Sequence, residues 1–274
     1  MKHISTSKSV LNIFTIWKGF NALFNLLVLC LGKIILKLLH HLYSFVLLVQ
    51  RLYINTISLI NSKSSHNEEI KLIEQKVLSL KKIPVHMVIV LGLEKPSYED
   101  LFRLLVWCFP AGISHISFYD HKNFINPLTL LETVSTLGKN YIPKIKWGKS
   151  FSTETKLISK RLINGYTWNP QLNVHVYKRE DGLESMVGIV KSLHREGVNR
   201  IDQAGLNELM RRHLEAPDPE LAIICGPVLS YYGFPPWNLR ITLMHSILSH
   251  HNITVTTFLR LLEKYAQTEQ RYGK

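Results

Sequence analysis

The residues best suited to bind a charged ligand are the last four of the sequence, Arg271, Tyr272, Gly273 and Lys274. An arginine can neutralise phosphate charge, and a glycine lets the backbone approach a phosphate closely and present its N–H group. By composition alone, such a terminus is more often a frayed end than a binding element. Its assignment therefore depends on what the rest of the sequence provides.

A second candidate is the pair Asp120-His121, which follows a predicted strand. A carboxylate beside an imidazole can perform general acid–base chemistry, although two polar residues in a strand-to-helix turn are the commoner interpretation. The other strand ends, at 91–96 and 225–227, carry no glycine-rich phosphate loop. Nor do they carry the carboxylates and arginines that metal–diphosphate chemistry needs. The sequence thus predicts a domain shaped like an enzyme without an evident catalytic set.

The elements that would position these residues alternate between strand and helix. Apolar runs of strand length predict buried strands at 85–91, 113–119, 172–177 and 221–225. Helical spacing of apolar residues predicts helices at 68–82, 97–109, 127–137, 183–195, 202–214 and 256–270. This alternation predicts an α/β fold with an open, mainly parallel sheet and helices on both faces. Ligands of such folds bind at the carboxyl ends of the strands.

Residues 1–60 are predicted to anchor the chain to a membrane. The net charge of +13 is concentrated in residues 1–67, which hold seven basic side chains and no acidic one. Three arrangements remain open. A single helix could span within 19–39 with Lys33 and Lys37 reaching the interface, two short segments could form a re-entrant hairpin, or amphipathic helices could lie in the interface. Residues 61–82 are predicted to form a linker and an amphipathic helix, and residues 83–274 the α/β domain.

Composition also limits the partners and the compartment. No basic–aromatic recognition motif follows the basic segment, so nucleic-acid binding is not expected. The three cysteines lie inside apolar runs without metal-ligand spacing, which is typical of buried thiols in a reducing compartment. We therefore expect the main domain to face the cytosol and to hold no metal of its own.

The domain resembles the Nogo-B receptor family, the accessory subunits of eukaryotic dehydrodolichyl diphosphate synthase, over residues 83–274 with a poorly matched middle. The resemblance is carried by Ile83-Pro84-Val85-His86-Met87, Val106-Trp107-Cys108, Gly112-Ile113-Ser114-His115-Ile116-Ser117-Phe118-Tyr119-Asp120-His121, Pro217-Asp218-Pro219-Glu220-Leu221, Gly226-Pro227-Val228, Gly233-Phe234-Pro235-Pro236-Trp237-Asn238-Leu239-Arg240-Ile241-Thr242 and Glu269-Gln270-Arg271-Tyr272-Gly273-Lys274. It implies the cis-prenyltransferase fold, similar to undecaprenyl diphosphate synthase.

The same resemblance implies that this chain has lost its own catalytic groups. Gly92 stands where catalytic relatives carry the aspartate that holds metal and substrate diphosphate. Pro96 and Ile224 stand where they carry arginines, and a second late arginine falls near Ser230. Losing an aspartate and three arginines makes independent elongation implausible, because these groups neutralise the phosphate charges.

The tail departs from that trend, since Arg271 and Gly273 match the Arg-x-Gly motif of the family. The resemblance implies that residues 271–274 reach the catalytic partner's active site and help bind isopentenyl diphosphate there, with Mg²⁺ held by that partner. Trp237 and Arg240 are the candidates for the subunit contact, although Trp237 could equally be ordinary core.

The implied function is to bind, tether and activate the catalytic subunit of a dehydrodolichyl diphosphate synthase complex at the endoplasmic reticulum. That complex would supply the dolichol precursor for protein glycosylation from farnesyl and isopentenyl diphosphates. Two alternatives stay open. The chain could be a membrane receptor or scaffold that uses the α/β domain only for protein binding, or a self-sufficient enzyme that uses Asp120 and His121.

Overall fold

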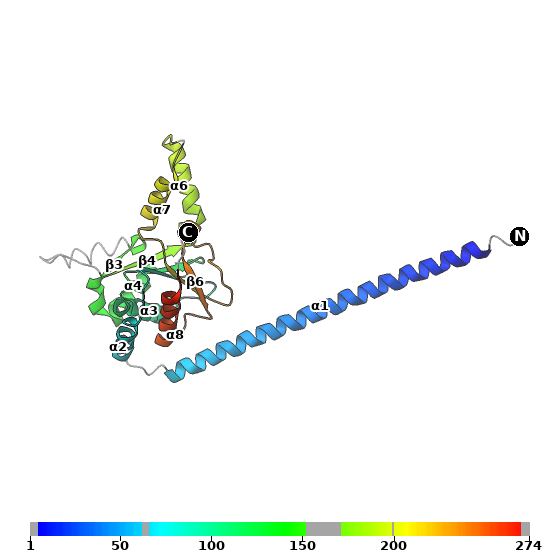
Figure 1. The fold of residues 1–274 in the computed structure, drawn as a ribbon, viewed down its shortest axis with the longest axis horizontal. Helices are drawn as coiled ribbons and strands as arrows, with labels where there is room; N and C mark the ends of the chain where they lie inside the picture. The colour runs from blue at the N-terminus through cyan, green and yellow to red at the C-terminus, as the bar shows by residue number, and fades with distance from the viewer. Residues whose placement is uncertain (1–4, 62–65, 152–170, 199, 270–274) are drawn as a thin grey trace. The chain divides into compact units, whose positions relative to one another are not determined.

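The computed structural model describes residues 5–61, 66–151, 171–198 and 200–269. Contacts within the chain group it into two units, Met1–Thr56 and Ile57–Lys274. The first unit contains most of the helix α1, which runs from Ser5 to Asn61 without a break (Figure 1). Its stretch Phe24–Val49 is long and apolar enough to cross a membrane by length and composition. This candidate membrane segment begins and ends later than the span expected at 19–39, and the continuous helix leaves no place for a re-entrant turn within it.

The second unit is built on a six-stranded sheet in the order β3-β4-β2-β1-β5-β6. Its strands are β1 (His86–Val90), β2 (His115–Asp120), β3 (Ile145–Trp147), β4 (Leu172–Lys178), β5 (Leu221–Cys225) and β6 (Leu243–Ile247). Every pair of neighbouring strands is parallel. The expected open, mainly parallel sheet is therefore confirmed.

Helices cover both faces of this sheet. The helices of this unit are α2 (His66–Val77), α3 (Tyr98–Ala111), α4 (Pro127–Leu137), α6 (Leu183–Arg195), α7 (Gln203–Leu214) and α8 (Val255–Gln267), of which α6 buries only Ser185. Buried residues of α2, α3, α4 and α8 join the larger core cluster on one face, whereas Leu214 of α7 lies in the smaller cluster on the other. Alternate residues of β1 enter the two clusters, which explains why this strand reads as an unbroken apolar run.

The structure departs from the sequence prediction at the edges of the sheet and at two helix ends. β3 lies between the helix expected at 127–137 and the strand expected at 172–177, where no element was expected, and β6 includes the polar residues His245 and Ser246 and is only partly buried. The helix expected at 68–82 ends at Val77. The helix expected at 97–109 continues to Ala111 with Pro110 inside its last turn, and Gly112 caps it at a φ of 75° with its N–H bonded to the carbonyls of Cys108 and Phe109.

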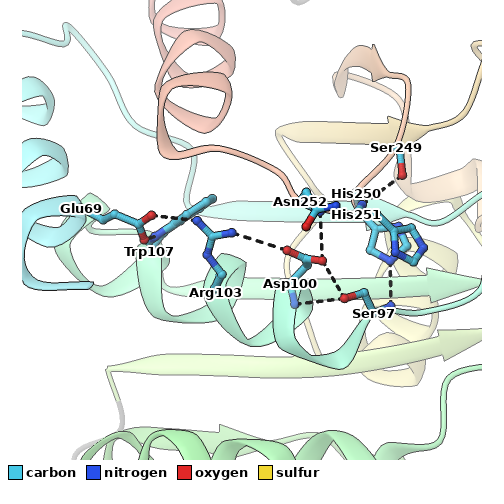
Figure 2. A network of polar contacts seen from close by, with 9 residues as sticks. All are labelled: Glu69, Ser97, Asp100, Arg103, Trp107, Ser249, His250, His251 and Asn252. Atoms are coloured by element: carbon cyan, nitrogen blue, oxygen red, sulfur yellow. Dashed lines mark hydrogen bonds and ion pairs between the residues drawn. The ribbon is translucent and has the colours of Figure 1, made fainter. Parts of the chain in front are cut away.

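A polar network ties α2 to the domain (Figure 2). Glu69 of α2 is 6% exposed, and its carboxylate accepts hydrogen bonds from Trp107 Nε1 at 3.0 Å and from Arg103 at 2.7 Å. Arg103 also lies 3.6 Å from the Asp100 carboxylate. A buried carboxylate is costly unless it is paired, so these two donors stabilise Glu69 where it lies. Helix α2 is thereby fixed on α3 of the sheet domain.

We expect Glu69→Ala to lower the free energy of unfolding by about 2 kcal/mol or more, because it leaves the buried indole N–H of Trp107 and the charge of Arg103 without their acceptor. Urea unfolding of the full chain in detergent, followed by tryptophan fluorescence, measures the change. The matched control is Glu74→Ala on the exposed side of the same helix, for which a change within about 0.5 kcal/mol is expected. Equal losses in both variants would contradict the role of the network.

A buried histidine makes the domain sensitive to acid. The His86 side chain is 1% exposed and sits between the Pro217 carbonyl, 2.6 Å from Nδ1, and the Ser117 hydroxyl, 2.7 Å from Nε2. The carbonyl can only accept, so Nδ1 carries the proton and Nε2 accepts from Ser117. Burial, the largest cause, lowers the pKa of His86 from 6.5 to about 3. The folded protein therefore holds this ring neutral at a pH where the unfolded chain protonates it.

Unfolding releases His86 to bind a proton below its unfolded pKa of 6.5. Stability should therefore be full above that pH and fall towards pH 3 by up to about 1.4 kcal/mol per pH unit. His86→Gln should remove the share of this slope that comes from one proton, leaving the share of His175, whose pKa burial lowers to about 4, whereas His66→Gln at an exposed position should leave the slope unchanged. Urea midpoints recorded at several pH values test the difference. Parallel slopes for wild type and His86→Gln would assign the acid sensitivity to other groups.

Candidate functional site

The parallel strands bring their carboxyl ends to one edge of the sheet, where ligands bind in folds of this kind. Gly92 follows β1, Asp120 ends β2, and Gly226 follows β5. Leu91 N–H bonds to the Tyr119 carbonyl at 3.0 Å, so the first two of these turns lie side by side. The positions singled out in the sequence at the ends of β1 and β2 are thus brought together.

Gly92 is fixed as glycine by its surroundings. Its φ is +61°, and a Cβ atom there would lie 2.3 Å from the Cys225 carbonyl oxygen and 3.2 Å from the Tyr232 ring. A side chain would therefore meet both left-handed strain and a collision with backbone of β5. An aspartate cannot occupy this position in the observed geometry.

Tyr232 occupies the space above Gly92, and the sequence prediction did not identify it. Its ring stacks on His121 with centroids 5.2 Å apart and planes at 23°. Its own backbone has a φ of 50°, and the Tyr119 hydroxyl donates to its carbonyl at 2.9 Å. Burial is the largest cause that raises the pKa of Tyr119 to about 12, so this hydroxyl keeps its proton and the bond. The only local indication in the sequence was the dipeptide Tyr232-Gly233, which is typical of a turn.

The Asp120 carboxylate is engaged by backbone N–H groups. Its carboxylate accepts from the N–H groups of Lys122 at 2.8 Å, Ile125 at 2.9 Å and Phe124. These bonds shape the turn that leads into α4, and the side chain is 1% exposed. A carboxylate held by three backbone donors at such burial is poorly placed to take a proton from a substrate. His121, held against Tyr232, has a pKa lowered chiefly by burial. The turn interpretation of Asp120-His121 therefore fits the structure better than acid–base catalysis.

Two of the three positions where the resemblance implies lost arginines, Pro96 and Ile224, can be placed in the structure. Ile224 is fully buried in β5, opposite Val90, inside the smaller core cluster. Pro96 precedes Ser97, the N-cap of α3, whose side chain accepts from the Asp100 N–H. An arginine at 224 would have to bury its charge among apolar neighbours, which is strongly unfavourable without a partner.

A group with the composition of a metal site lies close by. Ligand atoms of Glu94, Cys225 and His250 come within 4.8 Å of one another. Both ring nitrogens of His250 are already used, since Nδ1 is bonded to Glu94 at 2.8 Å and Nε2 accepts from Ser97 N–H at 2.9 Å. Burial raises the pKa of the Cys225 thiol well above its ordinary value, which disfavours the thiolate that a metal needs. These residues instead bind the loop after β6 to the loop after β1.

Figure 2 shows the hydrogen bond between Ser97 and His250 beside the network that begins at Glu69. Asp100 accepts from the Asn252 N–H at 3.1 Å and from the Ser97 hydroxyl at 2.6 Å. His251 Nε2 lies 3.0 Å from the carbonyl of Lys95. The loop before α8 is therefore held by several hydrogen bonds, and α8 leads directly to the C-terminal tail.

The two candidate interface residues are placed by specific bonds. Trp237 is partly exposed and donates from Nε1 to Asn207 Oδ1 of α7 at 2.8 Å. Arg240 is exposed and lies 3.1 Å from Asp218, which also accepts from Asn238 at 2.7 Å. Part of each side chain remains available on the surface. The tail residues Arg271, Tyr272, Gly273 and Lys274 lie outside the described residues.

Comparison with a solved lavandulyl diphosphate synthase supports the fold. A lavandulyl diphosphate synthase from Lavandula x intermedia superposes with a TM-score of 0.50 at 14% identity, covering 70% of this chain and 99% of that one. A probable undecaprenyl diphosphate synthase from Campylobacter jejuni gives a TM-score of 0.45 at 16% identity, covering 69% of this chain and 98% of that one. No protein-family model matches the sequence.

Comparison with characterised proteins is more specific. The chain is 33% identical over 211 residues to mouse dehydrodolichyl diphosphate synthase complex subunit Nus1, covering 72% of this chain and 68% of that protein. It is 32% identical over 208 residues to the human protein of that name, with coverage of 72% and 69%. The resemblance noted in the sequence is confirmed: the chain belongs to the family of dehydrodolichyl diphosphate synthase complex subunits of the Nus1 type.

Proposed function

We propose that this chain is a non-catalytic subunit that binds, tethers and activates a catalytic cis-prenyltransferase. The complex lengthens farnesyl diphosphate with isopentenyl diphosphate and provides the precursor of dolichol for protein glycosylation. It works at the endoplasmic reticulum membrane, with the α/β domain facing the cytosol and the N-terminal segment as the anchor.

The observation that carries this proposal is the packing around Gly92. Where a catalytic relative would present a metal-binding carboxylate, this chain has a glycine against the Cys225 carbonyl and under the Tyr232 ring. The position aligned with one of the lost arginines, Ile224, is buried core. Mg²⁺ prefers carboxylate and water ligands, so the residues present here do not fit the ion. Mg²⁺ belongs in the site of the catalytic partner.

The chain's own contribution is then structural and electrostatic. The sheet domain offers a surface for the partner, and residues 271–274 extend into the partner's site. There Gly273 presents a backbone N–H to the diphosphate of isopentenyl diphosphate, while Arg271 and Lys274 add positive charge. Charge-assisted hydrogen bonds of this kind are the strong ones for phosphate.

Co-expression with a candidate catalytic cis-prenyltransferase subunit tests the proposal. The pair should co-purify from detergent-solubilised membranes and elongate radiolabelled isopentenyl diphosphate on farnesyl diphosphate, whereas this chain alone should show no turnover. Turnover by the isolated chain would contradict the non-catalytic assignment. A stable chain that neither binds nor stimulates any such subunit would favour the receptor or scaffold alternative.

Trp237 is expected to contribute to the partner contact. Trp237→Ala should weaken association of the two subunits by about tenfold or more, because Trp is among the residues on which interface affinity concentrates. Asn207→Ala is the matched control, since it removes the hydrogen-bond acceptor of the indole but keeps the ring. Affinity is measured with purified subunits by titration, and stability by urea unfolding. If both variants lower stability and neither lowers affinity, Trp237 is a core residue.

A further inference from the structure

The loop between α2 and β1, residues 76–85, points one large apolar side chain into solvent. Leu78 is 88% exposed, the highest value among the large apolar side chains of the described residues. Val77, Leu80 and Ile83 are instead partly buried and pack against the larger core cluster. A single exposed leucine is ordinary on a protein surface, so the surroundings of Leu78 must decide whether it has a role.

Hydrogen bonds hold the loop in this form. Leu80 N–H donates to the Val77 carbonyl at 3.0 Å, which tightens the end of α2. Further on, Val85 N–H donates to the Glu220 carboxylate at 2.5 Å, and the Val85 carbonyl accepts from His115 N–H at 3.0 Å. Leu78 is therefore held outward by a fixed backbone, and covering its side chain requires no rearrangement. Removing a leucine side chain from water favours the covered state by about tenfold or more.

The same stretch of chain is basic. Residues 75–93 contain Lys76, Lys81 and Lys82 and no aspartate or glutamate. Lys76 pairs with Glu263 of α8 at 3.5 Å. The Lys81 side chain is exposed, and that of Lys82 is partly exposed. The exposed leucine therefore lies in a loop whose own charges are all positive.

Two kinds of surface could cover such a loop. A stable contact with a protein buries about 800 Å² on each partner, which is far more than one leucine provides. An anionic bilayer needs only a local fit, because acyl chains accept the leucine while lipid phosphates attract the neighbouring lysines. The positive charge and the small apolar surface therefore favour lipid.

The position of the loop along the chain favours the same partner. Only a short stretch separates it from α1, which ends at Asn61 and contains the candidate membrane segment Phe24–Val49. A short tether raises the effective concentration of a second, weak contact to about millimolar values. A loop with modest affinity for lipid is therefore covered once the anchor is in the bilayer.

We propose that residues 76–85 form a second membrane contact in addition to the anchor. Leu78 enters the boundary between headgroups and acyl chains, and Lys81 and Lys82 bind the phosphates of anionic lipids. The loop directly precedes β1, so the amino edge of the sheet faces the bilayer, and the carboxyl edge with Gly92 faces away from it. The contact rests on the membrane tether of the proposed function and needs no catalytic partner.

An environment-sensitive label tests the contact at opposite ends of β1. In a Cys30→Ser background, the full chain receives Leu78→Cys or Leu93→Cys; Leu93, at the carboxyl edge, is 61% exposed, and the native Cys108 and Cys225 are fully buried. The cysteine carries the fluorophore NBD, and the vesicles contain phosphatidylcholine and doxyl-labelled lipid, with or without phosphatidylserine. In anionic vesicles, position 78 should emit at shorter wavelength and be quenched by the doxyl group, whereas position 93 should behave as in water.

Charge reversal tests the lysines. Lys81→Glu should lower the ratio of inserted to aqueous label at position 78 by about fivefold or more in anionic vesicles, because one basic side chain near such a surface contributes about that factor. Lys95→Glu, at an exposed site on the carboxyl edge, should leave the ratio unchanged. Equal effects of the two variants, or equal insertion with and without phosphatidylserine, would overturn the assignment to anionic lipid.

Flotation of the same samples separates this contact from the tether. A chain that floats with the vesicles while position 78 stays in water would overturn the contact and leave the tether standing, and a chain that does not float would overturn both. A label at position 78 that is protected only after a catalytic cis-prenyltransferase subunit is added, without quenching by lipid, would assign the loop to that subunit and also overturn the proposal. Absence of prenyl transfer by a complex whose loop is inserted would contradict the proposed function alone.

Discussion

Removing residues 271–274 should lower the prenyl-transfer rate of the assembled complex by about 10²–10³-fold, the loss that follows deletion of one well-placed donor to developing or bound negative charge. The proposal assigns these residues to the partner's diphosphate site, where Gly273 gives the backbone close access and Arg271 supplies charge. Since α8 ends at Gln267 and its preceding loop is bonded to α3, the truncation leaves the packed domain intact. Initial rates with saturating farnesyl diphosphate measure the effect.

The controls separate loss of chemistry from loss of assembly. Size-exclusion chromatography should show the truncated chain still bound to its partner, and Arg260→Ala, at an exposed site on α8, should keep the full rate. Gly273→Ala should reproduce much of the loss if backbone approach is what matters, whereas Lys274→Ala should have a smaller effect. An undiminished rate after truncation would show that the tail has no role in prenyl transfer, and the chain would then act only as a tether.

The fold could be predicted from sequence wherever both faces of an element are buried. β1 and β5 are near-continuous apolar runs because alternate residues enter the two core clusters, and β2 and β4 place their alternate apolar residues in the larger cluster and a tyrosine each in the smaller one. β3 and β6 were not predicted because they are the edge strands of the sheet, and β6 contains polar residues such as His245 and Ser246. Pattern reasoning depends on burial, so it fails where a strand has only one neighbour.

Only part of the candidate site could be predicted from the sequence. The resemblance marked Gly92 as a missing aspartate, but nothing local indicated why a glycine stands there. The reason lies far along the chain, in Tyr232 and the Cys225 carbonyl, and only the folded sheet brings these together. The same holds for Glu69 and Trp107, whose bond joins residues 38 positions apart. The sequence can show that a catalytic group is absent, whereas only the tertiary structure shows which residues fill its place.

Restoring the aspartate should therefore not restore catalysis. Gly92→Asp should leave the isolated chain without turnover and lower its free energy of unfolding by about 3 kcal/mol, the sum of left-handed strain and forced overpacking. Gly92→Ala isolates the effect of the Cβ atom, which would lie 2.3 Å from the Cys225 carbonyl. Urea unfolding with and without Mg²⁺ measures stability, and an incorporation assay measures turnover.

Gly112 provides the matched comparison, because it also has a positive φ, +75°, but a Cβ atom there meets nothing within 4 Å. Gly112→Ala should cost about 1 kcal/mol from backbone strain alone, so the excess in Gly92→Ala reports the collision with β5. If the two alanine variants unfold alike, the sheet can open at Gly92 and room for a side chain exists. If Mg²⁺ then raised the free energy of unfolding of Gly92→Asp, the site would have lost one ligand but kept its shape. The fully buried Ile224 and the ring of Tyr232 argue that the shape has gone as well.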